Sequence, residues 1–236
     1  MASRRLTDIL AQLSVRGADG SGTLHLCEIS AEVSGTTGAG IMLQYDKLVD
    51  GSLCTTDGVA AYLDDLQYTL GEGPSIDAQD QGRVVAEPDL ESPDADRWPG
   101  LAPSAIEAGA KAMFAFPIRI GSVRLGSLNL YRDRAGPIEG ERYSDTVIMT
   151  DVAAHTIVGM QANAPPGSIA IELEEGANFH FVVHQAAGML SEQLDIGVAQ
   201  ALIRLRSHAF LSDSPIDQVA EAVVGRRLRL SDSDDV

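Results

Sequence analysis

The segment 179–230 contains three helical patterns in succession: FHFVVHQAAGMLSEQL (179–194), VAQALIRLRSHAF (198–210) and SPIDQVAEAVVGRRLRL (214–230). Apolar residues recur in each at intervals of three and four, the spacing of one helix face. The third pattern begins distinctly: Ser214 can cap the helix, Pro215 suits its first position, and Asp217 provides an acidic variant of a capping box. About 50 residues form a small bundle, so these helices are expected to pack on another surface of the protein.

The bulk composition indicates one or two globular domains, because the 236 residues are 44% apolar. No apolar run is long enough to span a membrane. The N-terminal stretch is interrupted by polar residues, unlike a signal peptide, and suits a short amphipathic helix. A cytoplasmic protein is therefore expected. Cys27 and Cys54 lack metal-type spacing, and free thiols are favoured over a disulfide.

The net charge of -17 is unevenly distributed. Residues 1–177 carry 26 acidic and 12 basic residues, whereas 178–230 carry five of each. A polyanion would be repelled by the first part and could approach only the second. The five arginines of the second part are Arg204, Arg206, Arg226, Arg227 and Arg229. The last three can equally complement the negative end of the third helix, and Arg206 can pair with Asp217 or a helix end.

Residues 20–162 alternate between helical and extended patterns. Extended patterns are expected at 38–46 and 48–56, paired as a hairpin through an Asp46–Lys47 turn, at 83–90 as an edge strand, and at 111–133 as two strands. Pro117 inside the last pair indicates an edge or a bulge. Helices are expected at 23–35, 59–70, 104–110 and 141–162, with a further short helix after the Gly71–Gly73–Pro74 loop.

The helix predicted at 141–162 is apolar around most of its circumference and therefore needs two partners. We expect one partner to be the sheet and the other to be the same helix of a second subunit, which predicts a homodimer. The residues expected on this dimer helix are Ile148, Val152, His155 and Gly159. After it, Pro165, Pro166 and Gly167 mark a domain boundary. Residues 168–177 alternate and fit a short strand or the start of a helix.

The helical segment resembles the ANTAR domain, an RNA-binding antitermination module. The resemblance lies in Ala186, Gly188, Met189 and Leu190 of the first helix, in Ala201, Leu205, Arg206 and Ala209 of the second, and in Val219 and Ala220 of the third. It implies a three-helix output that binds short tandem RNA stem-loops and promotes antitermination. The candidate RNA-contacting residues are His184, Ala187, Gly188, Arg204, Arg206, Arg226 and Arg227. Gly188 lies mid-helix, where glycine costs about 1 kcal/mol relative to alanine, so close packing of a neighbouring helix is favoured there over RNA contact.

Residues 20–162 resemble a GAF sensor domain of the kind fused to ANTAR modules in actinobacteria. The matching pieces are LGEGPSIDA (70–78), the run from Val84 to Pro99, and AFPIRIGSVRLGSLNLYRDRAGP (115–137). The implied fold class is α+β: a GAF-like antiparallel sheet with flanking helices, followed by a three-helix bundle. The implied organisation is an arm (1–19), a sensor (20–162), a linker (163–177), an output domain (178–230) and an acidic tail (231–236).

The sensor is expected to bind an unknown small molecule; no cofactor is identified. Its candidate pocket residues are Met42, Tyr45, Cys54, Gly71, Gly73, Pro74 and Trp98. No catalytic motif and no metal-ligand spacing are present, so a regulator rather than an enzyme is expected, without DNA or membrane partners. Two alternatives remain: a dimeric protein-interaction module without RNA binding, and a redox or haem sensor using Cys27, Cys54 or His155.

Overall fold

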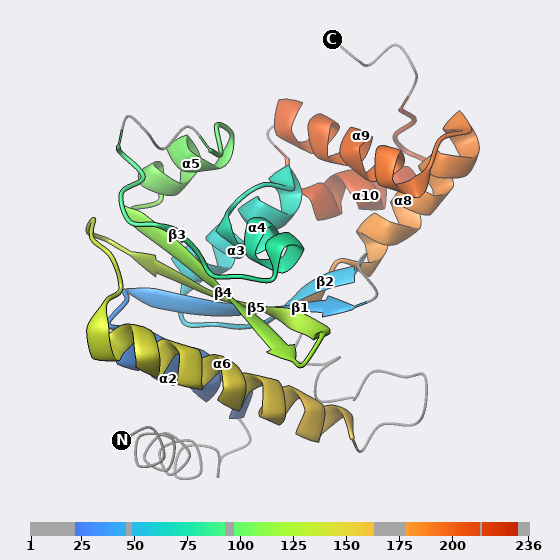
Figure 1. Cartoon of the computed structure of the whole chain (residues 1–236). Helices are drawn as coiled ribbons and strands as arrows, with labels where there is room; N and C mark the ends of the chain where they lie inside the picture. Colours follow the sequence, from blue (N-terminus) through green and yellow to red (C-terminus); the bar gives the residue numbers. More distant parts are fainter. Residues whose placement is uncertain (1–21, 46–48, 93–96, 163–177, 213, 231–236) are drawn as a thin grey trace.

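A computed structural model describes residues 22–45, 49–92, 97–162, 178–212 and 214–230. Its centre is a six-stranded antiparallel sheet with the order β3-β4-β5-β1-β2-β6 (Figure 1). The strands are β1 (Gly38–Tyr45), β2 (Val49–Thr55), β3 (Val85–Glu87), β4 (Ala112–Ile120), β5 (Val123–Arg132) and β6 (Asn178–Phe179). The predicted antiparallel sheet with flanking helices is confirmed.

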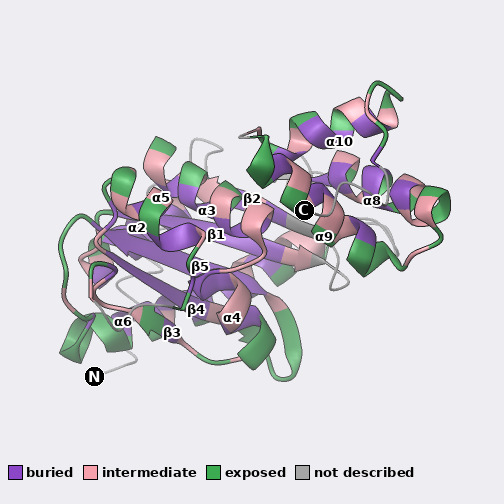
Figure 2. Ribbon diagram, turned by 90° about the horizontal axis from the view of Figure 1, so that it is seen from above, coloured by how far each residue is buried: buried purple, intermediate pink, exposed green. Residues whose placement is uncertain are grey.

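Helices cover both faces of the sheet (Figure 1). Helices α2 (Gly22–Ser34) and α6 (Gly140–Gln161) lie on one face; α3 (Gly58–Leu70), α4 (Pro74–Gln81) and α5 (Leu101–Glu107) lie on the other. Side chains of β4 alternate between two cores: Phe114 and Phe116 pack toward α2 and α6, and Met113 and Ala115 pack toward α3 and α5. Both faces are therefore buried, as the purple strands in Figure 2 show, which explains why this strand reads as a continuous apolar run.

The predicted strand pairings are confirmed in the sheet. Strands β1 and β2 form a hairpin, and β3 is an edge strand. Because β3 pairs with β4 only through Val85–Glu87, Pro117 lies beyond its end, on an edge of β4 that β3 does not cover. Strands β4 and β5 are joined by a two-residue turn in which Gly121 has a φ of 59°.

The partner of the long helix differs from the prediction. The six-turn helix is present as α6, but α2 of the same chain packs beside it (Figure 1). Val152 is buried in the core that α6, α2 and the sheet share, and Ile148 packs partly against that core. His155 and Gly159 are exposed. The sequence predicted α2 as a helix but not its position, so the apolar side of α6 was assigned to a second subunit. Dimerisation itself stays a prediction.

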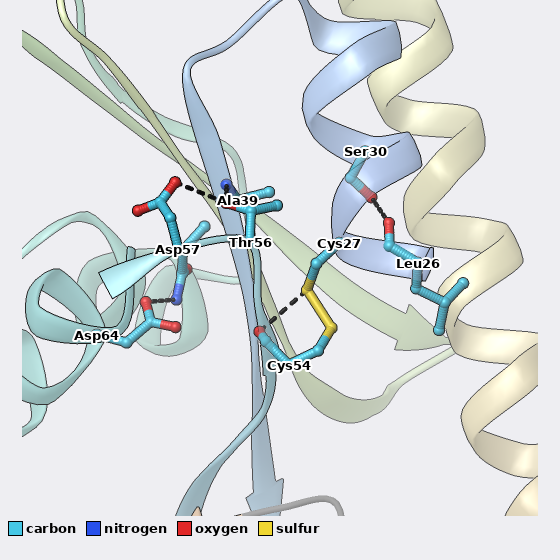
Figure 3. The surroundings of a disulfide bond; sticks show 9 residues. Leu26, Cys27, Ser30, Ala39, Cys54, Thr56, Asp57 and Asp64 are labelled. Atoms are coloured by element: carbon cyan, nitrogen blue, oxygen red, sulfur yellow. Dashed lines mark hydrogen bonds between the residues drawn. A yellow bond between two sulfur atoms is a disulfide. The ribbon is translucent and has the colours of Figure 1, made fainter. Parts of the chain in front are cut away.

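The two cysteines form a disulfide, contrary to the favoured interpretation of free thiols (Figure 3). Cys27 lies on α2 and Cys54 on β2, with their Cα atoms 6.2 Å apart. This separation lies within the range that a disulfide can bridge. The packing of α2 against β2 brings the residues together across 27 positions of sequence, so spacing along the chain could not indicate the pairing. A redox sensor that uses Cys27 and Cys54 would therefore have to act through this bond.

The three predicted C-terminal helices are present as α8 (Phe181–Leu194), α9 (Val198–Leu211) and α10 (Ile216–Val224). They pack around a core formed chiefly by Val183, Ala186, Ala187, Leu190, Ala201, Leu205, Ala209, Ile216, Val219, Ala220 and Val223. This group of helices is called the C-terminal bundle below. None of the helices in the described part of the chain is both long and apolar enough to span a bilayer.

Three local predictions in this region are wrong. Phe179 lies in β6, which pairs with Gly51 and Ser52 of β2, so the first helix begins two residues later. The Ser214 hydroxyl donates to the carbonyl of Ser212 and does not cap α10. Gly188 is exposed, and no described residue beyond its own stretch of helix lies within 4 Å of a Cβ placed there, so none of the described helices packs closely against it.

Several predictions fall on residues outside the described ranges. They concern the N-terminal arm, the Asp46–Lys47 turn, the linker with its strand or helix at 168–177, and the acidic tail.

Candidate functional site

The C-terminal bundle packs on α3 of the first part of the chain, on the same side of the sheet as α4 (Figure 1). Tyr68 of α3 is 1% exposed and belongs to the core of the bundle, together with Met42 of β1. Asp57 begins α3 by accepting a hydrogen bond from the amide of Ala60 at 2.8 Å. The contact between α3 and the bundle is called the α3–bundle interface below.

Tyr68 is the centre of this interface. The imidazole of His180 stacks on its ring, with centroids 3.9 Å apart and planes inclined by 8°. The guanidinium carbon of Arg206 lies 5.5 Å from the centroid of the same ring, within the range of a cation–π contact. The Tyr68 hydroxyl lies 3.3 Å from Nε2 of His184. One side chain from α3 therefore contacts three residues of the C-terminal segment.

Carboxylates from both parts of the chain surround His180, which is 2% exposed. Its Nδ1 donates to the carboxylate of Asp217 at 3.0 Å, and its Nε2 lies 3.9 Å from Asp65 Oδ1. Burial raises the pKa of Asp65; the charge of His180 lowers it and that of Asp217 raises it. Burial lowers the pKa of His184, and the charges of His180 and Arg206 lower it further. The interface is thus polar and charged as well as apolar.

Arg206 also approaches the end of α3. Gly71 closes that helix with a φ of 68°, and a Cβ placed there would lie 2.6 Å from Nη1 of Arg206. Glycine suits this position for both reasons, because other residues disfavour the conformation and a side chain would displace the guanidinium.

The seven residues predicted to contact RNA are divided among three environments. His184 and Arg206 face α3, as described above. Ala187 is completely buried in the bundle core and presents no surface to a ligand. The remaining residues are exposed or half-buried: Gly188, Arg204, Arg226 and Arg227.

The arginines after α10 form the exposed basic segment of the bundle. Arg226, Arg227 and Arg229 are all exposed, and Arg227 donates to the carbonyl of Glu221 at the end of α10. The helix-end interpretation is thus confirmed for Arg227. Asp217, the acid considered as a partner for Arg206, instead accepts from His180.

The described residues of the predicted pocket lie in different environments. Met42 belongs to the bundle core, Cys54 to the disulfide, and Trp98 to the core between the sheet and α3–α5. Gly71, Gly73 and Pro74 form the turn from α3 into α4, where Pro74 opens the helix as predicted. The side chain of Tyr45 lies outside the described part of the structure.

The interior beneath α3 contains a different polar site. Asp64 is 2% exposed and its Oδ1 accepts from Nδ2 of Asn129 on β5 at 2.8 Å. Its Oδ2 and the Oδ1 of Asn129 accept no hydrogen bond from the described residues. Burial raises the pKa of Asp64 from 3.8 to about 7, the hydrogen bond from Asn129 opposes this rise, and the charge of Asp65 adds to it. A cavity of about 10 Å³ beside these atoms has room for about one water molecule.

The sequence pattern of α3 does not reveal these polar residues, because the apolar side chains Val59, Tyr62, Leu63 and Leu66 favour a different face of the helix. The buried set is Ala60, Leu63, Asp64, Gln67 and Tyr68. Residues 60, 64 and 68 follow one another at intervals of four, so the periodicity was present; two polar residues in the buried stripe concealed it. Within the described ranges, no cluster of three or more His, Cys, Asp or Glu side chains is placed to hold a metal ion.

Comparison with known proteins identifies the fold of the first part. No family model matches the sequence, and no curated protein does. The GAF domain of a phosphoenolpyruvate-protein phosphotransferase from Coxiella burnetii superposes with a TM-score of 0.51 at 14% identity, over 67% of this chain and 94% of that domain. The GAF domain of the Acinetobacter phosphoenolpyruvate-protein phosphotransferase gives the same TM-score at 11% identity, with the same coverage of both chains. At these identities the likeness concerns the fold alone: the sheet and its flanking helices have the fold of a GAF domain.

Proposed function

We propose that this protein is a signal-responsive regulator rather than an enzyme, in which the GAF-like part controls RNA binding by the C-terminal bundle. The observation that supports this proposal best is that His184 and Arg206 both contact Tyr68 of α3. Both residues also belong to the predicted RNA surface. Packing on α3 and contact with RNA would therefore compete for the same two side chains.

The proposed RNA surface consists of the exposed arginines after α10, with His184 and Arg206 added when the bundle leaves α3. Arginine contacts to phosphate would position the RNA, and unpaired bases would be read by other side chains. A signal acting on the GAF-like part would have to bind the docked and undocked arrangements with different affinities in order to shift their populations. The proposed output is transcription antitermination on RNA stem-loops.

Removing Arg226 and Arg227 is expected to weaken RNA binding and its salt dependence. For the variant Arg226→Ala/Arg227→Ala we expect about 10-fold weaker binding of a two-hairpin transcript at about 0.1 M salt. The plot of log K against log salt should flatten by about 1.5, because each lost phosphate contact removes about 0.7–0.9 of slope. Fluorescence anisotropy across a salt series measures both quantities.

The matched control is Arg119→Ala/Arg134→Ala, which removes two exposed arginines from the GAF-like part. Its net charge equals that of the first variant, so equal losses of affinity in the two variants would reject the arginines after α10 as the contact surface. A second candidate function, a protein-interaction module, is favoured by the engagement of His184 and Arg206 with α3. Absence of RNA binding by the wild type and by Tyr68→Ala, which removes the Tyr68 contact of both side chains, would select that candidate.

A further inference from the structure

A groove of about 370 Å³ lies between the GAF-like part and the C-terminal bundle. The GAF-like part contributes Tyr62, Asp65 and Leu70 of α3 and Ser104 of α5 to its lining. The C-terminal bundle contributes Phe210 of α9 and Asp217 of α10. This feature is called the Phe210 groove below. Its volume falls in the range of small-molecule sites, which occur preferentially between domains. It is distinct from the small cavity beside Asp64, which lies under α3.

Two large aromatic side chains in the lining of the groove are exposed, one from the GAF-like part and one from the C-terminal bundle. Tyr62 is 46% exposed and Phe210 is 58% exposed. They come from α3 and α9, more than 140 positions apart in the chain, and both line the same cavity. Exposed apolar side chains that converge on one concave surface indicate that it is covered by a ligand or partner.

Two carboxylates line the groove, beside the neutral hydroxyls of Thr69, Ser104 and Ser214. Asp65 and Asp217 contribute carboxylates whose side chains are 58% and 36% exposed, so both can accept further hydrogen bonds. His180 lies between them and can offset one of the two charges when protonated. No Lys or Arg occurs among the described residues that line the groove. The charge of the lining therefore favours a cation.

We propose that the Phe210 groove binds a small organic cation with an aromatic body. The ammonium group would lie at Asp65 and Asp217, and the ring would lie between Tyr62 and Phe210, whose faces attract both aromatic rings and cations. Such a molecule would contact α3, α9 and α10 together. It would therefore bind the docked arrangement more tightly than a separated one and would stabilise the α3–bundle interface. The proposal does not depend on RNA binding.

Calorimetric titration of the full chain with 2-phenylethylammonium tests the proposal. Three matched probes isolate its parts: 2-phenylethanol lacks the charge, 3-phenylpropanoate reverses it, and ethylammonium lacks the ring. We expect the aromatic cation to bind about 10-fold more tightly than the neutral alcohol, and the other two to bind more weakly still. A rise in Tm should accompany binding of the aromatic cation.

Four variants locate the site. Asp65→Asn should weaken binding of the aromatic cation about five-fold, and Phe210→Ala about 10-fold. Both residues are substantially exposed, so the fold should be retained, which circular dichroism checks. The controls are Asp80→Asn, an exposed acid on α4, and Leu211→Ala, an exposed neighbour of Phe210 that does not line the groove; neither should change the affinity.

Two results would overturn the proposal. Equal affinity for the aromatic cation and its neutral analogue would show that the carboxylates do not select the ligand. Binding that survives both Asp65→Asn and Phe210→Ala would place the ligand elsewhere. Because no RNA is present in these titrations, their failure leaves the proposed RNA function untouched, and failure of RNA binding leaves the groove proposal untouched.

Discussion

Replacing Tyr68 with alanine is expected to detach the C-terminal bundle from α3 and to destabilise the protein by about 3–5 kcal/mol, the usual cost of truncating a buried aromatic residue. Tyr68 is 1% exposed, and the substitution removes the stacked partner of His180, the cation–π contact of Arg206 and the hydroxyl near His184. Urea unfolding measures the change in the free energy of unfolding. Amide hydrogen exchange should show faster exchange in α8–α10 than in the sheet.

Two further variants make the result specific. Tyr62→Ala removes an exposed tyrosine from the same helix and should lower the free energy of unfolding by less than about 1 kcal/mol. Tyr68→Phe removes only the hydroxyl and should cost about 1 kcal/mol, the net value of one hydrogen bond. If Tyr68→Ala and Tyr62→Ala were equally stable and exchanged alike, the α3–bundle interface would not hold the bundle in place. The proposed function adds that Tyr68→Ala should bind RNA more tightly than the wild type.

Replacing Asp64 with asparagine is expected to protect the protein from a loss of stability between pH 5 and pH 8. The folded-state pKa of Asp64 is about 7, raised above its ordinary value of 3.8 by burial. A carboxyl with a raised pKa stabilises the folded protein while it is protonated. This stabilisation is fully present below pH 3.8 and is lost as pH rises through about 7, because the folded state keeps the proton to a higher pH than the unfolded state. From pH 5 to pH 8 the loss is about 3 kcal/mol, because the slope is about 1.4 kcal/mol per pH unit until the folded-state carboxyl ionises near pH 7.

Asparagine does not titrate, so Asp64→Asn should lack this loss. The free energy of unfolding of the variant minus that of the wild type should therefore be about 3 kcal/mol larger at pH 8 than at pH 5. Urea unfolding of both proteins at the two pH values measures this difference, because all other ionisable side chains are common to both. Asp80→Asn, at an exposed position of α4, should follow the wild type. Parallel behaviour of Asp64→Asn and the wild type would mean that Asp64 is ionised throughout this range.

Local rules predicted most of the elements. Periodicity and turn residues located the β1–β2 hairpin, the β4–β5 turn, the long helix and the three C-terminal helices, because these features depend on residues a few positions apart. The start of α5, in contrast, depends on a residue that is distant in the sequence. The helix was expected from residue 104 but begins at Leu101, because the Glu72 carboxylate accepts hydrogen bonds from the amides of Gly100 and Leu101. A cap supplied from 28 residues away leaves no local signal.

The sequence by itself determined which segments become helices and strands, and it confined the positive charge near the C-terminus to a few arginines. Only the tertiary structure decided what those segments contact. It placed α2 beside α6, joined Cys27 to Cys54, buried Asp64, and turned His184 and Arg206 toward Tyr68. The physical reason is that helix and strand preferences act between near neighbours, whereas burial and pairing depend on surfaces brought together from distant parts of the chain.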